Sequence, residues 1–67
     1  MIVLNGESAS FRAGETLDAV LASLGLTATS PGVAIAVDRE VVPRAEWETF
    51  TLADGASVEV LTAMQGG

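Results

Sequence analysis

The sequence predicts an α+β fold in which one amphipathic helix packs across one face of a mixed sheet of four to five strands. Three observations predict it: apolar segments bounded by strong hairpin-turn dipeptides, one stretch of helical periodicity, and one run of alternating large and small apolar residues. Because the chain has 67 residues, it has room for one small domain. We expect this domain to span residues 1–63 and to be followed by a flexible Gly-Gly tail at 64–67.

The first expected element is an N-terminal hairpin. Met1 to Leu4 is an apolar run that stops at Asn5-Gly6. Asn-Gly favours a type I′ turn because both residues tolerate positive φ. Ser8 to Arg12 then alternates polar and apolar residues, which predicts a half-buried return strand.

One helix is expected after the turn at 13–15. Thr16 is a favourable N-cap, and Gly25 suits the left-handed residue that follows a helix. The apolar residues between them repeat at i, i+3, i+4 and i+7, as on the buried stripe of a helix. They are Leu17, Val20, Leu21 and Leu24. We expect them to contact the inward side chains of the sheet, which are Ile2, Leu4, Phe11, Ile35, Val58 and Val60.

The second half of the chain predicts another hairpin. Val33 to Val37 has a large aliphatic residue at every second position, as a strand buried on one face has. A turn at 38–40 leads into the short strand Val41-Val42, which Pro43 stops. Arg44 to Trp47 is then expected to form a single helical turn.

The last strand is expected from Ser57 to Leu61, after the turn signal Asp54-Gly55. The first and last strands can be neighbours only if they run parallel, joined through the crossover that contains the helix. This arrangement is an α+β roll.

Composition narrows the classes of partner. The formal net charge is −6, because nine acidic residues oppose three arginines. Nucleic acids and anionic membranes are poor partners for such a chain, whereas a basic groove on another protein is a natural one. No secretory signal precedes the first strand, and no apolar stretch approaches the ~20 residues of a membrane span. We therefore expect a cytoplasmic protein.

The missing residue types narrow the chemistry. The chain has no cysteine and no histidine, so it has no disulfide, no usual transition-metal site and no Ser-His or Cys-His nucleophile. Lysine is absent as well, which removes Schiff-base chemistry. The acidic pair Glu46 and Glu48 is best interpreted as part of a solvated loop. We expect a protein that is not an enzyme and that binds neither a metal nor a cofactor.

The pair Gly66-Gly67 at the C-terminus is the strongest candidate for chemistry. Without a Cβ, these residues can enter a channel too narrow for other side chains. The carboxylate of Gly67 is ionised at neutral pH and can attack an electrophile such as the α-phosphorus of ATP. Taken on its own, such a pair is far more often an ordinary polar chain end than a reactive group.

Several segments together resemble a known family. The Asn5-Gly6 hairpin, the Val41-Val42-Pro43-Arg44 to Trp47 segment, the Asp54-Gly55 turn, Val58-Glu59-Val60 and the closing Gln65-Gly66-Gly67 carry the resemblance. On these residues the chain resembles the ubiquitin-like β-grasp sulfur carriers of the ThiS/MoaD type, and most closely those of thiamine biosynthesis. The resemblance implies a β-grasp fold.

The resemblance also implies a function. A ThiF-like (E1-like) partner enzyme would adenylate Gly67 with ATP, and sulfur from a donor such as a cysteine desulfurase would convert the adenylate to a thiocarboxylate. A ThiG-like thiazole synthase would accept that sulfur, and Gly66 would give the tail its slim, flexible approach. Four alternatives stay open: the small subunit of molybdopterin synthase, a sulfur carrier of another pathway, a ubiquitin-like protein modifier, and an interaction module whose glycines are incidental.

The sequence also predicts where partners dock. If Ile2 and Val60 face the helix, Val3 and Leu61 face away from it, because side chains alternate along a strand. Val41 could extend the same surface. We expect these three residues to form an exposed apolar docking patch.

Overall fold

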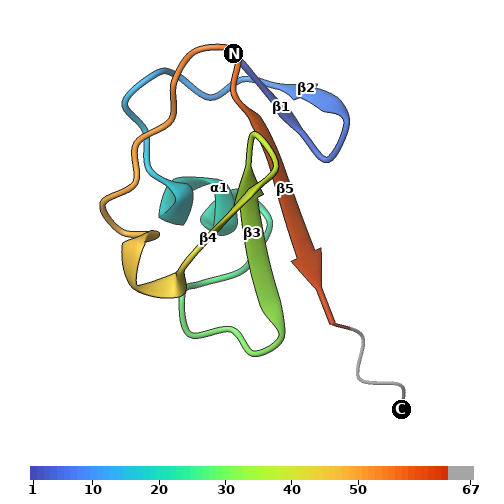
Figure 1. Cartoon of the computed structure of the whole chain (residues 1–67), viewed down its shortest axis with the longest axis vertical. Helices are drawn as coiled ribbons and strands as arrows, with labels where there is room; N and C mark the ends of the chain where they lie inside the picture. Colours follow the sequence, from blue (N-terminus) through green and yellow to red (C-terminus); the bar gives the residue numbers. More distant parts are fainter. Residues whose placement is uncertain (64–67) are drawn as a thin grey trace.

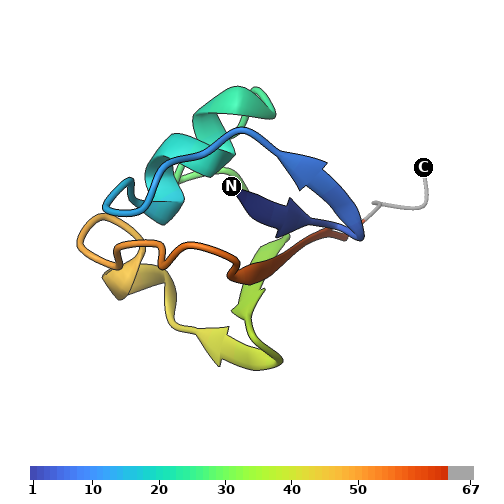
Figure 2. The ribbon, with the colours of Figure 1, turned by 90° about the horizontal axis from the view of Figure 1, so that it is seen from above.

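One helix packs across one face of a five-stranded sheet in this computed structural model, which describes residues 1–63 (Figure 1). The elements, in chain order, are β1 (Ile2–Leu4), β2 (Glu7–Ala9), α1 (Leu17–Ser23), β3 (Val33–Val37), β4 (Glu40–Val42), the 3₁₀ turn η1 (Arg44–Glu46) and β5 (Ser57–Thr62). Figure 2 shows α1 on one side of the sheet. The predicted α+β architecture is confirmed. No helix within residues 1–63 is long and apolar enough to cross a membrane.

The sheet has the order β2-β1-β5-β3-β4, so the last strand lies in its centre. β1 runs parallel to β5, with Val3 opposite Ser57, and the other neighbours are antiparallel. The parallel pairing of the first and last strands is therefore confirmed. β5 therefore connects the β1–β2 hairpin to the β3–β4 hairpin, and β1 and β3 each pair with it.

The first hairpin has the predicted turn but a shorter return strand. Asn5 and Gly6 have φ values of 49° and 84°, the positive values that a type I′ turn requires. β2 ends at Ala9, so the predicted continuation to Arg12 is wrong. The N–H of Phe11 donates to the carbonyl oxygen of Ala9 at 3.0 Å, and this local turn takes the chain out of the sheet.

The second hairpin has the same type of turn without a glycine. Asp38 and Arg39 have φ values of 50° and 72°. Aspartate tolerates the left-handed region comparatively well, but arginine occupies it at a cost of roughly 1–2 kcal/mol. Arg39 is therefore a position of backbone strain.

The helix buries three of the four residues predicted for its apolar stripe. Leu17, Val20 and Leu21 are fully buried, whereas Leu24 is 44% exposed, so its assignment to the core is wrong. The helix ends before Leu24 in a Schellman motif: the N–H of Leu26 donates to the carbonyl of Leu21, and that of Gly25 to the carbonyl of Ala22. This turn directs Leu26 toward the core in place of Leu24. Gly25 has the predicted positive φ, at 76°.

The N-terminus of the helix differs from the usual cap. Thr16 occupies the N-cap position, as predicted, but its side chain makes no capping hydrogen bond. Its backbone instead forms an isolated antiparallel bridge with Thr51. This bridge ties the start of the helix to the segment before β5.

The core lies between α1 and the sheet. Of the six inward residues predicted for the sheet, Leu4 and Phe11 are only partly buried. The other four are buried as expected, namely Ile2, Ile35, Val58 and Val60. Trp47, which the sequence patterns did not place in the core, is the largest fully buried side chain. Its Nε1 donates to the carbonyl oxygen of Val42 at 2.8 Å, which satisfies the one polar atom that it buries.

Candidate functional site

The face of the sheet opposite α1 carries exposed aliphatic side chains. Val3, Val41 and Leu61 are 36%, 76% and 60% exposed, respectively. Their neighbours along the strands, such as Ile2, Val42 and Val60, are buried in the core. The period-2 prediction that Val3 and Leu61 face away from the helix is therefore confirmed, and Val41 is exposed as well.

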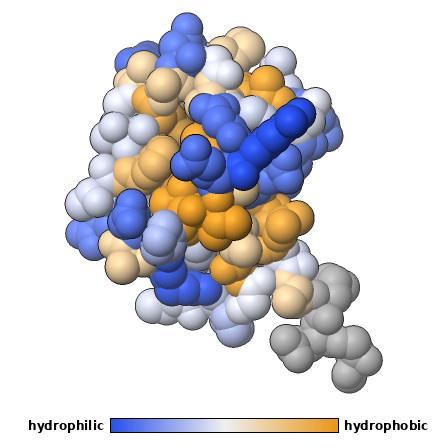
Figure 3. All heavy atoms as spheres, in the orientation of Figure 1, coloured by the Kyte–Doolittle hydropathy of each residue, from blue (hydrophilic) through white to orange (hydrophobic). Residues whose placement is uncertain are grey.

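Strand register decides which of the three lie together. Leu61 is directly opposite Ala34, and Val41 is directly opposite Ala36. These four residues form a continuous apolar area, which we call the outer patch. In the view of Figure 3, hydrophobic residues gather over the middle of the sheet and hydrophilic residues lie around them.

Val3 lies apart from the outer patch. It pairs with Ser57, at the start of β5, about 13 Å along the strand from Leu61. The exposed residue Glu59 lies between them on β5 and faces Ala36 across the ladder. A partner that covers Val3 and Leu61 together therefore also covers a carboxylate, which favours a partner with a basic group at that point.

The chain leaves the sheet beside the outer patch. β5 ends at Thr62, and the N–H of Ala63 then donates to the carbonyl oxygen of Gly32 at 2.7 Å. This bond continues the β3–β5 ladder by one residue. The predicted tail at 64–67, with Gly66 and Gly67, lies outside the residues that the structure describes.

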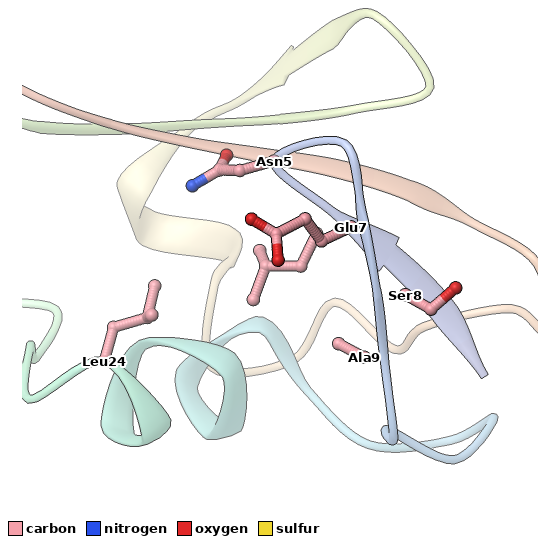
Figure 4. A pocket seen from close by; sticks show the side chains of 6 residues that line it. Asn5, Glu7, Ser8, Ala9 and Leu24 are labelled. Atoms are coloured by element: carbon pink, nitrogen blue, oxygen red, sulfur yellow. The ribbon is translucent and has the colours of Figure 1, made fainter.

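A concave region lies away from the outer patch. An open groove of about 270 Å³ separates the β1–β2 hairpin from the C-terminal end of α1 (Figure 4). Its lining residues are Leu4, Asn5, Glu7, Ser8, Ala9 and Leu24. Glu7 is the only titratable side chain among them, and within residues 1–63 no three His, Cys, Asp or Glu residues gather to bind a metal. The groove therefore offers no set of groups for catalysis.

Two residues at the tail exit were missed as parts of a site by sequence reasoning. The sequence gives no signal that singles out Gly32, and it marks Arg44 only as part of the segment that carries the family resemblance. The side chain of Arg44 contacts the loop that contains Gly32. Spacing along the chain gives no signal for this contact, because the two residues belong to separate elements.

The fold and the exposed sheet face define a class, the ubiquitin-like β-grasp domains that present a sheet face beside the exit of their last strand. The particular family follows from comparison. The model of the ThiS family matches residues 2–67, so the chain belongs to the ThiS family.

Solved structures agree with this family. The chain is 26% identical to the thiamine biosynthesis protein ThiS of Geobacter metallireducens in a crystal structure, with a TM-score of 0.74, covering 98% of this chain and 97% of that one. A solution NMR structure of a thiamine biosynthesis protein from the same organism also gives 26% identity and a TM-score of 0.74, covering 98% of this chain and 86% of that one. The β-grasp fold is thereby confirmed.

One curated relative is a larger protein. A thiazole synthase from Paramagnetospirillum magneticum is 33% identical over 66 residues, which are 98% of this chain and 20% of that protein. The chain therefore spans about a fifth of the length of this relative.

Proposed function

We propose that the protein is a sulfur carrier for the thiazole of thiamine, and that the carboxylate of Gly67 is its reactive group. The observation that carries the proposal is the ThiS family match, which extends to residue 67 and so includes Gln65-Gly66-Gly67. The ThiS structure from Geobacter metallireducens supports the same pathway.

The composition limits how this chain could hold sulfur. It has no cysteine, so it cannot hold sulfur as a persulfide. The proposed site of covalent sulfur attachment is therefore the C-terminal carboxylate. In the proposed sequence the Gly67 carboxylate attacks the α-phosphorus of ATP in a ThiF-like enzyme and expels pyrophosphate. With a persulfide from a donor such as a cysteine desulfurase, the outer sulfur would displace AMP to give an acyl disulfide, and a thiol reductant would then cleave the S–S bond to release the thiocarboxylate. Sulfide itself would displace AMP and give the thiocarboxylate directly.

The partner enzymes would supply the catalytic groups and bind the ATP, and this chain would act as their co-substrate. Gly66 has no Cβ and would let the chain end pass through a narrow entrance. No residue of the domain is assigned a catalytic role. This division of roles agrees with a domain that has neither histidine nor cysteine.

The outer patch and Val3 are the proposed docking surface. Ordering the tail in an active site costs roughly 1–2 kcal/mol per residue, so contacts made by the folded body must offset this cost. The exposed aliphatic side chains of the outer patch could supply them. A ThiG-like thiazole synthase is the proposed acceptor, because one thiazole synthase contains a segment similar to this whole domain.

Intact-mass spectrometry tests the proposal. The purified protein is incubated with a ThiF-like enzyme, ATP and a sulfide source, and we expect a mass increase equal to the exchange of one oxygen for one sulfur. A variant that lacks Gly67 should show no exchange while its circular dichroism and unfolding curve stay unchanged. The thiocarboxylated protein should then support thiazole formation by a thiazole synthase.

Two results would overturn it. If the variant without Gly67 supports thiazole formation as well as the intact chain, the reactive group is elsewhere. If the protein appears as adducts on other proteins and never exchanges oxygen for sulfur, it is a modifier and not a carrier.

A further inference from the structure

Arg44 holds the second half of the loop that precedes β3. Its guanidinium donates to the carbonyl oxygen of Ala28, in the middle of the loop, and to that of Val33, at 3.3 Å, where β3 begins. Within residues 1–63 the one ion pair joins the Met1 ammonium and Asp54, so the charge of Arg44 is directed to backbone carbonyls and not to a carboxylate. Planar donors spaced as in a guanidinium can bind two such acceptors at once.

Arg44 is itself held by the core. Its Cζ lies 4.6 Å from the ring centroid of Trp47, a cation–π contact with the largest buried side chain. Trp47 is fixed in turn by the hydrogen bond from its Nε1 to Val42. The loop therefore has a rigid attachment to the sheet through two side chains.

The same loop contacts the chain as it leaves the sheet. Gly32 accepts the hydrogen bond from the N–H of Ala63 and has a φ of 72°. A Cβ at position 32 would lie 3.2 Å from the Cβ of Ala63, so the side chain of Ala63 also lies close to Gly32. The position of Gly32 therefore sets the position of Ala63, the residue directly before the proposed tail.

We infer that Arg44 is a positioning residue, which acts through the loop at 28–33 and through Gly32 to set the position and direction of the chain at Ala63, where it leaves the sheet. The inference rests on the proposed function, because that function requires a partner enzyme to bind the tail. A tail that starts in the direction of the partner's active site loses less conformational freedom on binding. The inference also assigns a role to the segment from Val42 to Trp47, to which the carrier chemistry assigns none.

Amide hydrogen exchange tests the structural part without any partner enzyme. Arg44→Met removes both donors and keeps most of the aliphatic stem. We expect the Ala63 amide to exchange roughly tenfold faster in this variant, while the Val58 amide keeps its rate. Arg44→Lys should restore part of the protection, because an ammonium can bind one of the two carbonyls.

Two outcomes of this measurement contradict the inference. An unchanged Ala63 amide in Arg44→Met would show that Arg44 does not act on the tail exit. Equal acceleration of Ala63 and Val58 would show that Arg44 only stabilises the fold as a whole.

A pair of proline variants tests the functional part. Ala63→Pro removes the N–H that donates to Gly32 and leaves Arg44 and the core untouched. Thr62→Pro is the matched control. Successive backbone N–H groups of β5 point alternately toward β3 and toward β1, and the N–H of Thr62 points to the β1 side, at a level beyond the last residue of β1. Both variants stiffen the chain at nearly the same point.

Adenylation kinetics with a ThiF-like enzyme then separate the two. We expect Ala63→Pro and Arg44→Met to raise the KM for the carrier by roughly two- to tenfold with kcat nearly unchanged, and Thr62→Pro to stay close to the parent protein. Equal impairment by both prolines, or an unchanged KM in Ala63→Pro, would overturn the inference. If the parent protein is not adenylated at all, the proposed function fails, and the exchange measurement still decides whether Arg44 controls the exit.

Discussion

The side chain of Asn5 accepts a hydrogen bond from the backbone N–H of Val60, with Oδ1 and N 2.8 Å apart. The N–H of Asn5 also donates to the carbonyl oxygen of Val58 at 2.9 Å. Because β1 ends at Leu4, the Asn5 side chain takes the place that the next residue of β1 would have on the ladder. Through these two hydrogen bonds a turn residue continues the pairing of β1 with the central strand β5.

Asp38 has the same role on the other edge of β5. Its N–H donates to the carbonyl oxygen of Ser57 at 2.7 Å, and its Oδ1 accepts from the Ser57 N–H at 3.0 Å. Asn5 and Asp38 are each the first residue of a hairpin turn, and both have positive φ. Each hairpin therefore supports β5 through a turn side chain, Asp38 at its first residue and Asn5 at Val60.

Two substitutions at Asn5 should separate its turn role from its support of β5. Asn5→Gly keeps the positive φ but loses the acceptor, and should lower the free energy of unfolding by about 0.5–1.5 kcal/mol. Asn5→Ala also places an unsuited residue in the left-handed region, which adds roughly 1–2 kcal/mol. Urea unfolding measures both. Equal losses in the two variants would contradict the separation, as would an unchanged exchange rate of the Val60 amide in Asn5→Gly.

Arg39→Gly should stabilise the protein. It relieves the left-handed strain at φ 72° and, after the larger chain entropy of glycine is subtracted, should raise the free energy of unfolding by up to about 1 kcal/mol. Thermal or urea unfolding measures the change. Asp38→Gly is the comparison, and it should destabilise because it removes the acceptor for Ser57. Destabilisation by Arg39→Gly would show that strain in this turn is not significant.

Leu21 and Leu24 provide a matched test of the helix packing. They are the same residue type three positions apart, but Leu21 is fully buried and Leu24 is 44% exposed. Leu21→Ala should cost roughly 2–5 kcal/mol, a large part of the stability of so small a domain. Leu24→Ala should cost less than about 1 kcal/mol. Similar losses in chemical denaturation would mean that the helix packs in a different rotation.

The outer patch should determine partner affinity. Leu61→Asp or Val41→Asp places a carboxylate on the apolar area and should weaken binding to the adenylating enzyme and to the thiazole synthase by roughly tenfold or more. Val3→Asp should have a smaller effect, because Val3 lies apart from the patch. Isothermal titration calorimetry measures the affinities.

Leu24→Asp is the control for these variants. It introduces the same charge at an exposed leucine that lies on the groove side of the molecule and not on the outer face. Its affinity for both partners should match that of the parent protein. Unchanged affinity in Leu61→Asp and Val41→Asp, or equal weakening by Leu24→Asp, would exclude the outer patch as the docking surface.

Most of the fold could be predicted from local patterns. The Asn5-Gly6 turn and the strand from Val33 to Val37 depend on residues close in sequence, and both are confirmed. The errors occur where long-range packing decides. Helical periodicity placed Leu24 in the core, but the Schellman motif redirects the chain there. Alternation extended β2 past Ala9, where the hydrogen bond from the Phe11 N–H to the Ala9 carbonyl turns the chain out of the sheet.

The candidate site could be predicted only in part, for the same reason. Alternation along single strands predicted that Val3, Val41 and Leu61 face outward. Which of them lie together depends on strand register. The register places Leu61 and Val41 opposite nearby residues of β3, whereas Val3 lies opposite Ser57 at the start of β5. Composition contains no information about register between distant strands.

The central place of β5 has a consequence for synthesis of the protein. The strand that completes the sheet is the last of those that the structure describes, so the two hairpins lack their shared neighbour until residues 57–62 have left the ribosome. The outer patch is itself divided between β3, β4 and β5, and it does not exist before that moment. A partner that binds this surface would therefore not recognise a chain in which β5 has yet to pair with β3.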